Sequence, residues 1–138
     1  MKFIPLILIL LLTSSCSFSV KPPEPVGQYP ATVQVVAKGL KENTLIPDEV
    51  AWFSLHISSL SSQTDPVAKE RMTPDNPLKN YRLDSGKEYT FAFRGVSPIF
   101  GGIKTCNVSL PVKLKKSQRV RIIFEKKSGI CKIRTERM

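Results

Sequence analysis

The chain has 138 residues, of which 41% are hydrophobic and 23% are charged, with 21 lysines and arginines against 11 aspartates and glutamates. This length accommodates one small domain and excludes a large multidomain enzyme. Three cysteines and one histidine leave few ligands for a metal cluster and few bases for a histidine-dependent catalytic site. The formal net charge of +10 is the property that most restricts the choice of partner.

The first 16 residues have the three parts of a secretory signal. Lys2 is followed by an apolar run at residues 3–12 and by small polar residues that end at Cys16. The run is shorter than the ~20 apolar residues that a membrane-spanning helix needs. Residues 12–16 resemble the lipobox of bacterial lipoproteins, with Thr13 where that motif most often has leucine. An ordinary cleaved signal with an incidental cysteine is the alternative.

The resemblance implies that residues 1–15 are a lipoprotein signal peptide and that Cys16 is acylated, for example with palmitate, and begins the mature chain. Two or three acyl chains give durable membrane anchoring. Ser17 stands where an aspartate would be the usual signal for inner-membrane retention, so the resemblance implies the outer membrane, facing the periplasm. Residues 16–30 would then hold the lipidated cysteine and a linker, in which residues 18–30 contain four prolines and predict a semi-rigid, extended tether that reaches roughly 40 Å.

From residue 31 onward the hydrophobic pattern has a period of two, which predicts an all-β domain over residues 31–138. Turn signals at residues 84–86, 115–117 and 126–129 separate the expected strands. We expect a small β-sandwich of about six to seven strands, immunoglobulin-like or transthyretin-like, with a small barrel as the alternative. The positions predicted to face inward are Val33, Val35 and Ala37; Ala51, Phe53, Leu55 and Ile57; Tyr89, Phe91 and Phe93; Val108, Leu110, Val112 and Leu114; Val120, Ile122 and Phe124; and Cys131 and Ile133.

Residues 59–80 interrupt this pattern, because they are polar and contain three prolines. The stretch is too long for a hairpin and predicts a crossover between sheets. Asp65 followed by Pro66 could begin a short helix that runs through Met72, because aspartate is a good N-cap and proline suits the first helical position.

Cys106 and Cys131 remain once Cys16 is lipidated, and an even pair in an exported protein predicts a disulfide. Two free buried thiols or a metal half-site are the alternatives, although neither a nearby histidine nor a CxxC spacing supports a metal. In a flat three-stranded meander the two cysteines would lie about 9.6 Å apart, which is too far for a bridge. The disulfide therefore predicts that the last strand crosses to the opposite sheet, that the sheet curls strongly, or that Cys106 precedes the ladder.

The positive charge is local. Residues 16–103 carry nine basic and nine acidic side chains, whereas residues 104–138 carry eleven basic against two acidic. Lysines also fill the turns at 115–116 and 126–127. Strand alternation predicts a basic face, for which a solvated sheet face is the plain alternative. The residues placed on it are Lys113, Arg119, Arg121, Lys132 and Arg134.

Ile99 and Phe100 lie in a turn bounded by Pro98 and two glycines. Such an apolar loop tip predicts a docking point for a partner, and the alternative is a loop that folds its own phenylalanine over the end of the sandwich. No nucleophile–base constellation or Gly-x-Ser-x-Gly elbow is present. The sequence therefore predicts a non-catalytic protein without a metal site or cofactor.

In size, anchor and fold class the chain resembles small lipoproteins that serve secretion systems and surface appendages, such as type III pilotins and the lipoprotein of the type VI membrane complex. This resemblance implies an adaptor-like binding or assembly factor for an envelope protein. The alternative is a binder of lipopolysaccharide, phospholipid or acidic glycan through the basic face. Nucleic acid is not expected, because of the export signal and because most strand aromatics face inward.

Overall fold

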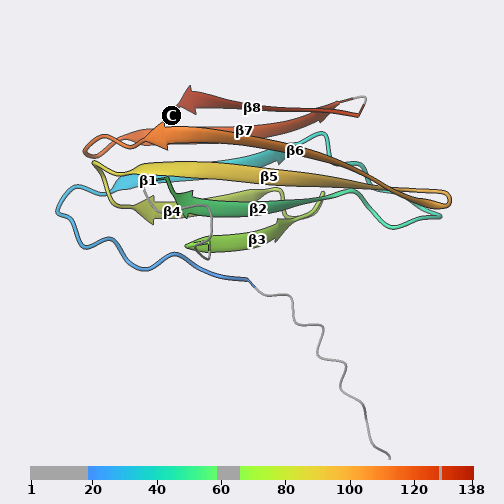
Figure 1. The fold of residues 1–138 in the computed structure, drawn as a ribbon, viewed down its shortest axis with the longest axis horizontal. Helices are drawn as coiled ribbons and strands as arrows, with labels where there is room; N and C mark the ends of the chain where they lie inside the picture. The colour runs from blue at the N-terminus through green and yellow to red at the C-terminus, as the bar shows by residue number, and fades with distance from the viewer. Residues whose placement is uncertain (1–18, 59–65, 128) are drawn as a thin grey trace, which may run out of the picture.

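The computed structural model describes residues 19–58, 66–127 and 129–138, which form two packed β-sheets (Figure 1). The lipobox, Cys16 and Asp65 lie outside these residues. The all-β sandwich is confirmed, with eight strands instead of six or seven, and the described part of the chain holds no helix able to span a membrane. The strands are β1 (Ala31–Lys38), β2 (Val50–Ile57), β3 (Ala68–Met72), β4 (Leu78–Leu83), β5 (Glu88–Ile99), β6 (Gly102–Lys113), β7 (Arg119–Lys127) and β8 (Ile130–Arg137).

Four strands make up each sheet. The first sheet has the order β4-β1-β7-β8 and the second has the order β3-β2-β5-β6. All pairings between strands are antiparallel except that of β1 with β7. In the immunoglobulin order the first two strands are neighbours in one sheet, whereas here β1 and β2 belong to different sheets. Of the expected folds, this leaves the transthyretin-like sandwich.

Aromatic side chains from both sheets form the centre of the core. Phe53 and Phe91 of the second sheet and Phe124 of the first are fully buried, and the ring centroids of Phe93 and Phe124 are 5.0 Å apart. The inward positions predicted on β1, β2, β5 and β7 are buried, apart from a half-buried Ile57. Those on β6 and β8 are only half-buried, because both strands are sheet edges. Each fully buried side chain of this size stabilises the fold by about 1.5–3 kcal/mol.

The helix expected to end at Met72 is wrong. Residues 68–72 form strand β3, in which Ala68 and Met72 are buried while Lys69 and Arg71 are exposed. Pairing with β2 outweighs the local helix-start signal, because a five-residue segment gains more from tertiary contacts than from its own propensity. The crossover between sheets is confirmed and is short, since a turn at residues 73–76 leads directly into β4 of the other sheet.

Part of the predicted proline-rich linker is attached to the domain by hydrogen bonds. Val20 exchanges two main-chain hydrogen bonds with Lys69 of β3, each at 2.9 Å. The carboxylate of Asp84 accepts hydrogen bonds from the N–H groups of Val26 and Gly27. A proline-rich segment has few N–H groups, because proline lacks one. The remaining N–H groups of this segment bond to the edge of a sheet or to a side chain.

Each lateral edge of the sandwich carries a link between the two sheets. At one edge Lys79 of β4 forms an ion pair with Glu70 of β3, with Nζ and Oε2 3.4 Å apart. At the other edge the predicted disulfide joins Cys106 of β6 to Cys131 of β8, with Cα atoms 6.0 Å apart. Of the three arrangements expected for this bridge, the chain adopts the crossing to the opposite sheet, and β7 and β8 cross together.

Lys126 is inside the protein, although its position was predicted to be a turn. It belongs to β7, is 8% exposed and pairs with Glu49 just before β2. The Glu49 carboxylate also accepts hydrogen bonds from the hydroxyl of Ser97 and the N–H of Lys41. Burial raises the pKa of Glu49, but these hydrogen bonds and the Lys126 ammonium outweigh it and leave the pKa below its ordinary value.

Candidate functional site

The hairpin formed by β5 and β6 extends past the other strands, and the connection between β1 and β2 runs out beside it almost as far (Figure 1). Both strands have 12 residues, and they pair up to Ile99 and Gly102 at the tip. Phe100 is 83% exposed, Ile103 61% and Ile99 41%. Phe100 therefore does not fold over the end of the sandwich, which was the alternative. The tip presents three apolar side chains to solvent at a turn where Gly101 adopts a φ of 85°.

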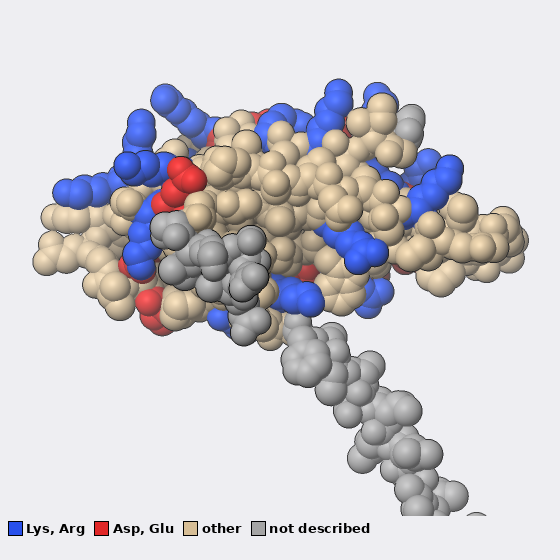
Figure 2. All heavy atoms as spheres, viewed as in Figure 1, with Lys and Arg blue, Asp and Glu red and all other residues tan. Residues whose placement is uncertain are grey.

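The five residues expected to form one basic face are divided between the two sheets. Lys113 ends β6 of the second sheet, whereas Arg119, Arg121, Lys132 and Arg134 lie on β7 and β8 of the first. Figure 2 shows lysine and arginine side chains at several places around the molecule. The single basic face is therefore corrected to a basic pair of strands, with Lys113 elsewhere.

Acidic neighbours compensate part of the charge on β7 and β8. Arg134 donates a hydrogen bond of 2.7 Å to Glu125, which lowers the pKa of Glu125 and raises that of Arg134. Glu136 lies 3.6 Å from Arg121, and the Nε of Arg121 donates to Gln34. These are the only two acidic residues in the basic C-terminal third. Because both lie beside arginines of β7 and β8, this pair of strands carries a smaller net positive charge than its basic residues alone would give it.

Two further cations, Lys127 and Lys132, lie near the turn between β7 and β8. A shallow hollow of about 500 Å³ there is lined by Glu125, Lys127, Ile130, Lys132 and Arg134. Within the described ranges, neither Lys127 nor Lys132 takes part in an ion pair. Of the predicted basic residues, Lys132 and the paired Arg134 are those that line a concave surface.

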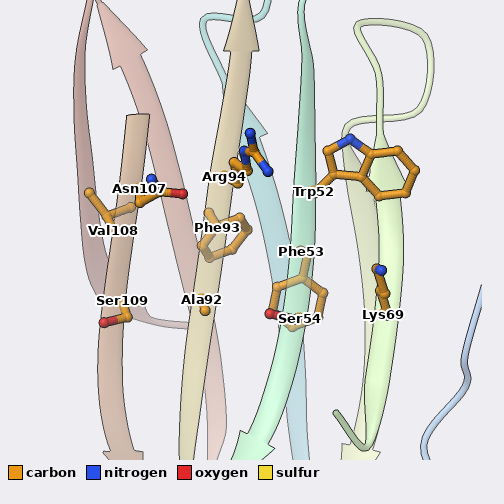
Figure 3. Close-up of a pocket in the computed structure, with 10 residues that line it drawn as sticks. All are labelled: Trp52, Phe53, Ser54, Lys69, Ala92, Phe93, Arg94, Asn107, Val108 and Ser109. Carbon is orange, nitrogen blue, oxygen red and sulfur yellow. The ribbon is translucent and has the colours of Figure 1, made fainter. Parts of the chain in front are cut away.

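A second hollow, of about 530 Å³, lies on the outer face of the second sheet (Figure 3). Cross-strand pairing aligns its side chains in two rows. One row runs from Arg71 through Trp52 and Arg94 to Asn107, and the next contains Lys69, Ser54, Ala92 and Ser109. The side chains of Trp52 and Arg94 in the first row are larger than those of Ser54, Ala92 and Ser109 in the second. The second row is therefore the floor of a trough that runs across the strands.

Sequence reasoning missed this trough. Lys69 and Arg71 were placed in a helix, which hid the fact that they share a face with Trp52. The alternation of exposed and buried residues at 68–72 was the available signal. The proximity of Arg94 to Trp52 has no local signal, because it depends on the register between β5 and β2.

His56 lies on the same outer face, where its Nε2 is 3.3 Å from the hydroxyl of Ser54. Across residues 19–58, 66–127 and 129–138, no three histidine, cysteine, aspartate or glutamate side chains are grouped as metal ligands are. Comparisons of the chain with protein-family models, with curated proteins and with solved structures find no significant match.

Proposed function

We propose that this protein is a lipoprotein of the bacterial cell envelope that acts as a non-catalytic adaptor for an envelope protein. The observation that carries the proposal is the β5–β6 tip, where Ile99, Phe100 and Ile103 are exposed at the end of the two longest strands. Exposed apolar side chains of this kind often mark a site that a partner protein covers. A hairpin held by two paired strands loses little conformational entropy on binding, which favours such an interaction. Acyl chains on Cys16 would hold the domain at the outer membrane.

The docked linker supports this arrangement. Because Val20 is bonded to β3, only residues 17–19 separate Cys16 from the domain, and the four Cα-to-Cα steps from Cys16 to Val20 reach about 13 Å at ~3.3 Å each. An anchored Cys16 would keep the β3 edge close to the bilayer. The β6–β8 edge, which lies across the sandwich from β3, would then face away from the membrane, toward the periplasm.

Site-specific photo-crosslinking tests the adaptor role. A photoreactive phenylalanine analogue at position 100 should crosslink to a defined envelope protein in living cells, and the same analogue at Arg82, which is exposed on β4, should not. Phe100→Ser should abolish the crosslink-identified protein's function in the cell without lowering the amount of the lipoprotein. Equal adducts at both positions, or full function of Phe100→Ser, would reject the tip as the docking site.

The anchor is tested separately. Cys16→Ala should remove labelling by radioactive palmitate and move the protein from the membrane fraction to the soluble periplasmic fraction. Retention of labelling would contradict lipidation at Cys16.

The hollow between β7 and β8 favours a second candidate function, the binding of an anionic envelope component. Lys127 and Lys132 line it without ion pairs in the described residues. Affinity that falls steeply with ionic strength and is lost in Lys132→Glu would favour this function. An affinity that is insensitive to salt and lost in Phe100→Ser would favour the adaptor.

A further inference from the structure

We propose that the trough beside Trp52 binds an acidic saccharide, a short sugar chain whose rings carry carboxylate or phosphate groups. This site is separate from the hairpin tip and from the β7–β8 hollow. The proposal therefore does not depend on either function given above.

Charge is the first observation that supports it. The side chains that line the trough include Lys69 and Arg94, and no aspartate or glutamate of the described residues lines it. Arg71 extends the row beyond Trp52. Among the residues that the structure describes, none of these three cations forms an ion pair. The nearest acidic side chain on β3, Glu70, faces inward and pairs with Lys79. The surface is therefore complementary to an anion.

The second observation is an aromatic platform among these cations. Trp52 is half-buried, and the Nζ of Lys69 lies 5.8 Å from the centroid of its ring. Figure 3 shows the indole at one end of a row that continues with Arg94 and Asn107. An indole packs against the apolar face of a sugar ring, while an adjacent lysine or arginine binds the acid group of the same ring.

The shape of the trough selects a chain instead of a single ion. It crosses four strands, which are three spacings of ~4.8 Å, so that it is about 14 Å long. Ser54, Ala92 and Ser109 leave its floor low because their side chains are small. The hydroxyls of the two serines and the amide of Asn107 add donors and acceptors suited to sugar hydroxyl groups. An isolated phosphate would occupy only a fraction of this length.

Trp52 is the only tryptophan of the chain, so its fluorescence reports on this site directly. Titration of the full-length protein in neutral detergent with a short oligogalacturonate should change the emission and give a saturable curve. The methyl ester of the same oligosaccharide, which keeps the rings and removes the charge, should bind about ten-fold more weakly or worse, because each charge-assisted hydrogen bond is lost.

Matched variants locate the binding. Arg94→Gln and Lys69→Gln should each weaken oligogalacturonate binding about ten-fold, whereas Arg82→Gln, on the outer face of the first sheet, should leave the affinity unchanged. All three residues are exposed, so unaltered thermal unfolding should accompany each change. Trp52→Leu, measured by calorimetry, should lose most of the affinity.

Three results would overturn the proposal. One is equal affinity for the acid and the methyl ester. Another is binding that Arg94→Gln and Arg82→Gln weaken to the same extent. The third is a Trp52 response to phosphatidylglycerol vesicles, or to inorganic phosphate, without a response to oligogalacturonate, because the ligand would then be a lipid surface or a simple ion.

Discussion

Val20 and Lys69 exchange a pair of main-chain hydrogen bonds, each 2.9 Å long, which attach the segment that precedes β1 to the outer edge of β3. Edge strands expose unpaired N–H and C=O groups, and this pairing satisfies one pair of them within the same chain. It also holds the N-terminal part of the described chain against this edge of the sandwich.

Asp84 should control whether this segment remains docked. In Asp84→Ala the N–H groups of Val26 and Gly27 lose their acceptor, and we expect a loss of about 1 kcal/mol in the free energy of unfolding. Hydrogen exchange followed by mass spectrometry should become faster in peptides covering residues 20–30. Asp75→Ala is the control, because Asp75 is exposed in the turn between β3 and β4. Equal exchange in both variants would contradict the role of Asp84.

Gly95 should be intolerant of any side chain. A Cβ atom there would lie 2.7 Å from the Sγ of Cys106 and 3.1 Å from the ring of Phe124. Gly95→Ala should therefore lower the free energy of unfolding by about 1–3 kcal/mol, measured by urea denaturation. Gly102→Ala, where an added Cβ meets nothing within 4 Å, should have little effect.

The disulfide itself closes a separation of 25 residues and should contribute about 3 kcal/mol. Replacing both Cys106 and Cys131 by alanine should remove that contribution. In this background Gly95→Ala should cost at least about 0.5 kcal/mol less than in the wild type, because one obstacle to the new Cβ has gone. An identical cost in both backgrounds would show that the sulfur is not what excludes a side chain at position 95.

The ion pair of Glu49 and Lys126 should make stability depend on pH. The pKa of Glu49 is lowered in the folded state, so its contribution is complete above the unfolded pKa of about 4.3 and is lost as the pH falls through the lower folded value. Glu49→Gln leaves the Lys126 ammonium buried without a counter-charge. It should cost about 3 kcal/mol at pH 7 and progressively less below pH ~4.

Thermal unfolding across this pH range measures the effect. Glu42→Gln, at an exposed neighbouring position, should change neither the melting temperature nor its pH dependence. A Glu49→Leu/Lys126→Met double variant should recover much of the loss, because it removes both buried charges together. A pH-independent difference between wild type and Glu49→Gln would contradict the assigned ionisation.

The hairpin tip should contribute little to stability. Phe100 is 83% exposed, so Phe100→Ser should change the free energy of unfolding by less than about 0.5 kcal/mol. Phe93→Ser on β5, the strand that leads to the tip, removes a fully packed ring and should cost about 3 kcal/mol or more. A large destabilisation by Phe100→Ser, seen in chemical denaturation, would indicate that the tip packs against the domain.

Local pattern was sufficient to predict six of the eight strands, and β3 and β4 were the exceptions. The period of two predicted the sheets and which residues of β1, β2, β5 and β7 face the core, because successive side chains of a strand point to opposite sides. The same rule placed Cys106 and Cys131 on inward positions. Because a disulfide cannot join Cα atoms more than about 7 Å apart, this pair excluded a flat meander of the last three strands. Local pattern failed at β3, where a proline and an aspartate imitate a helix start, and at Lys126, where a lysine occupies an inward position.

The sequence by itself determined the strand-forming segments other than β3 and β4, the cysteine pair and the net excess of positive charge at the C-terminal end. Only the tertiary structure decided which charges are neighbours. Arg134 beside Glu125, Lys126 beside Glu49, and Trp52 between Arg71 and Arg94 all result from pairing or packing between segments far apart in the chain. Strand order and register are determined by burial of the whole core, and no local run of residues contains that information.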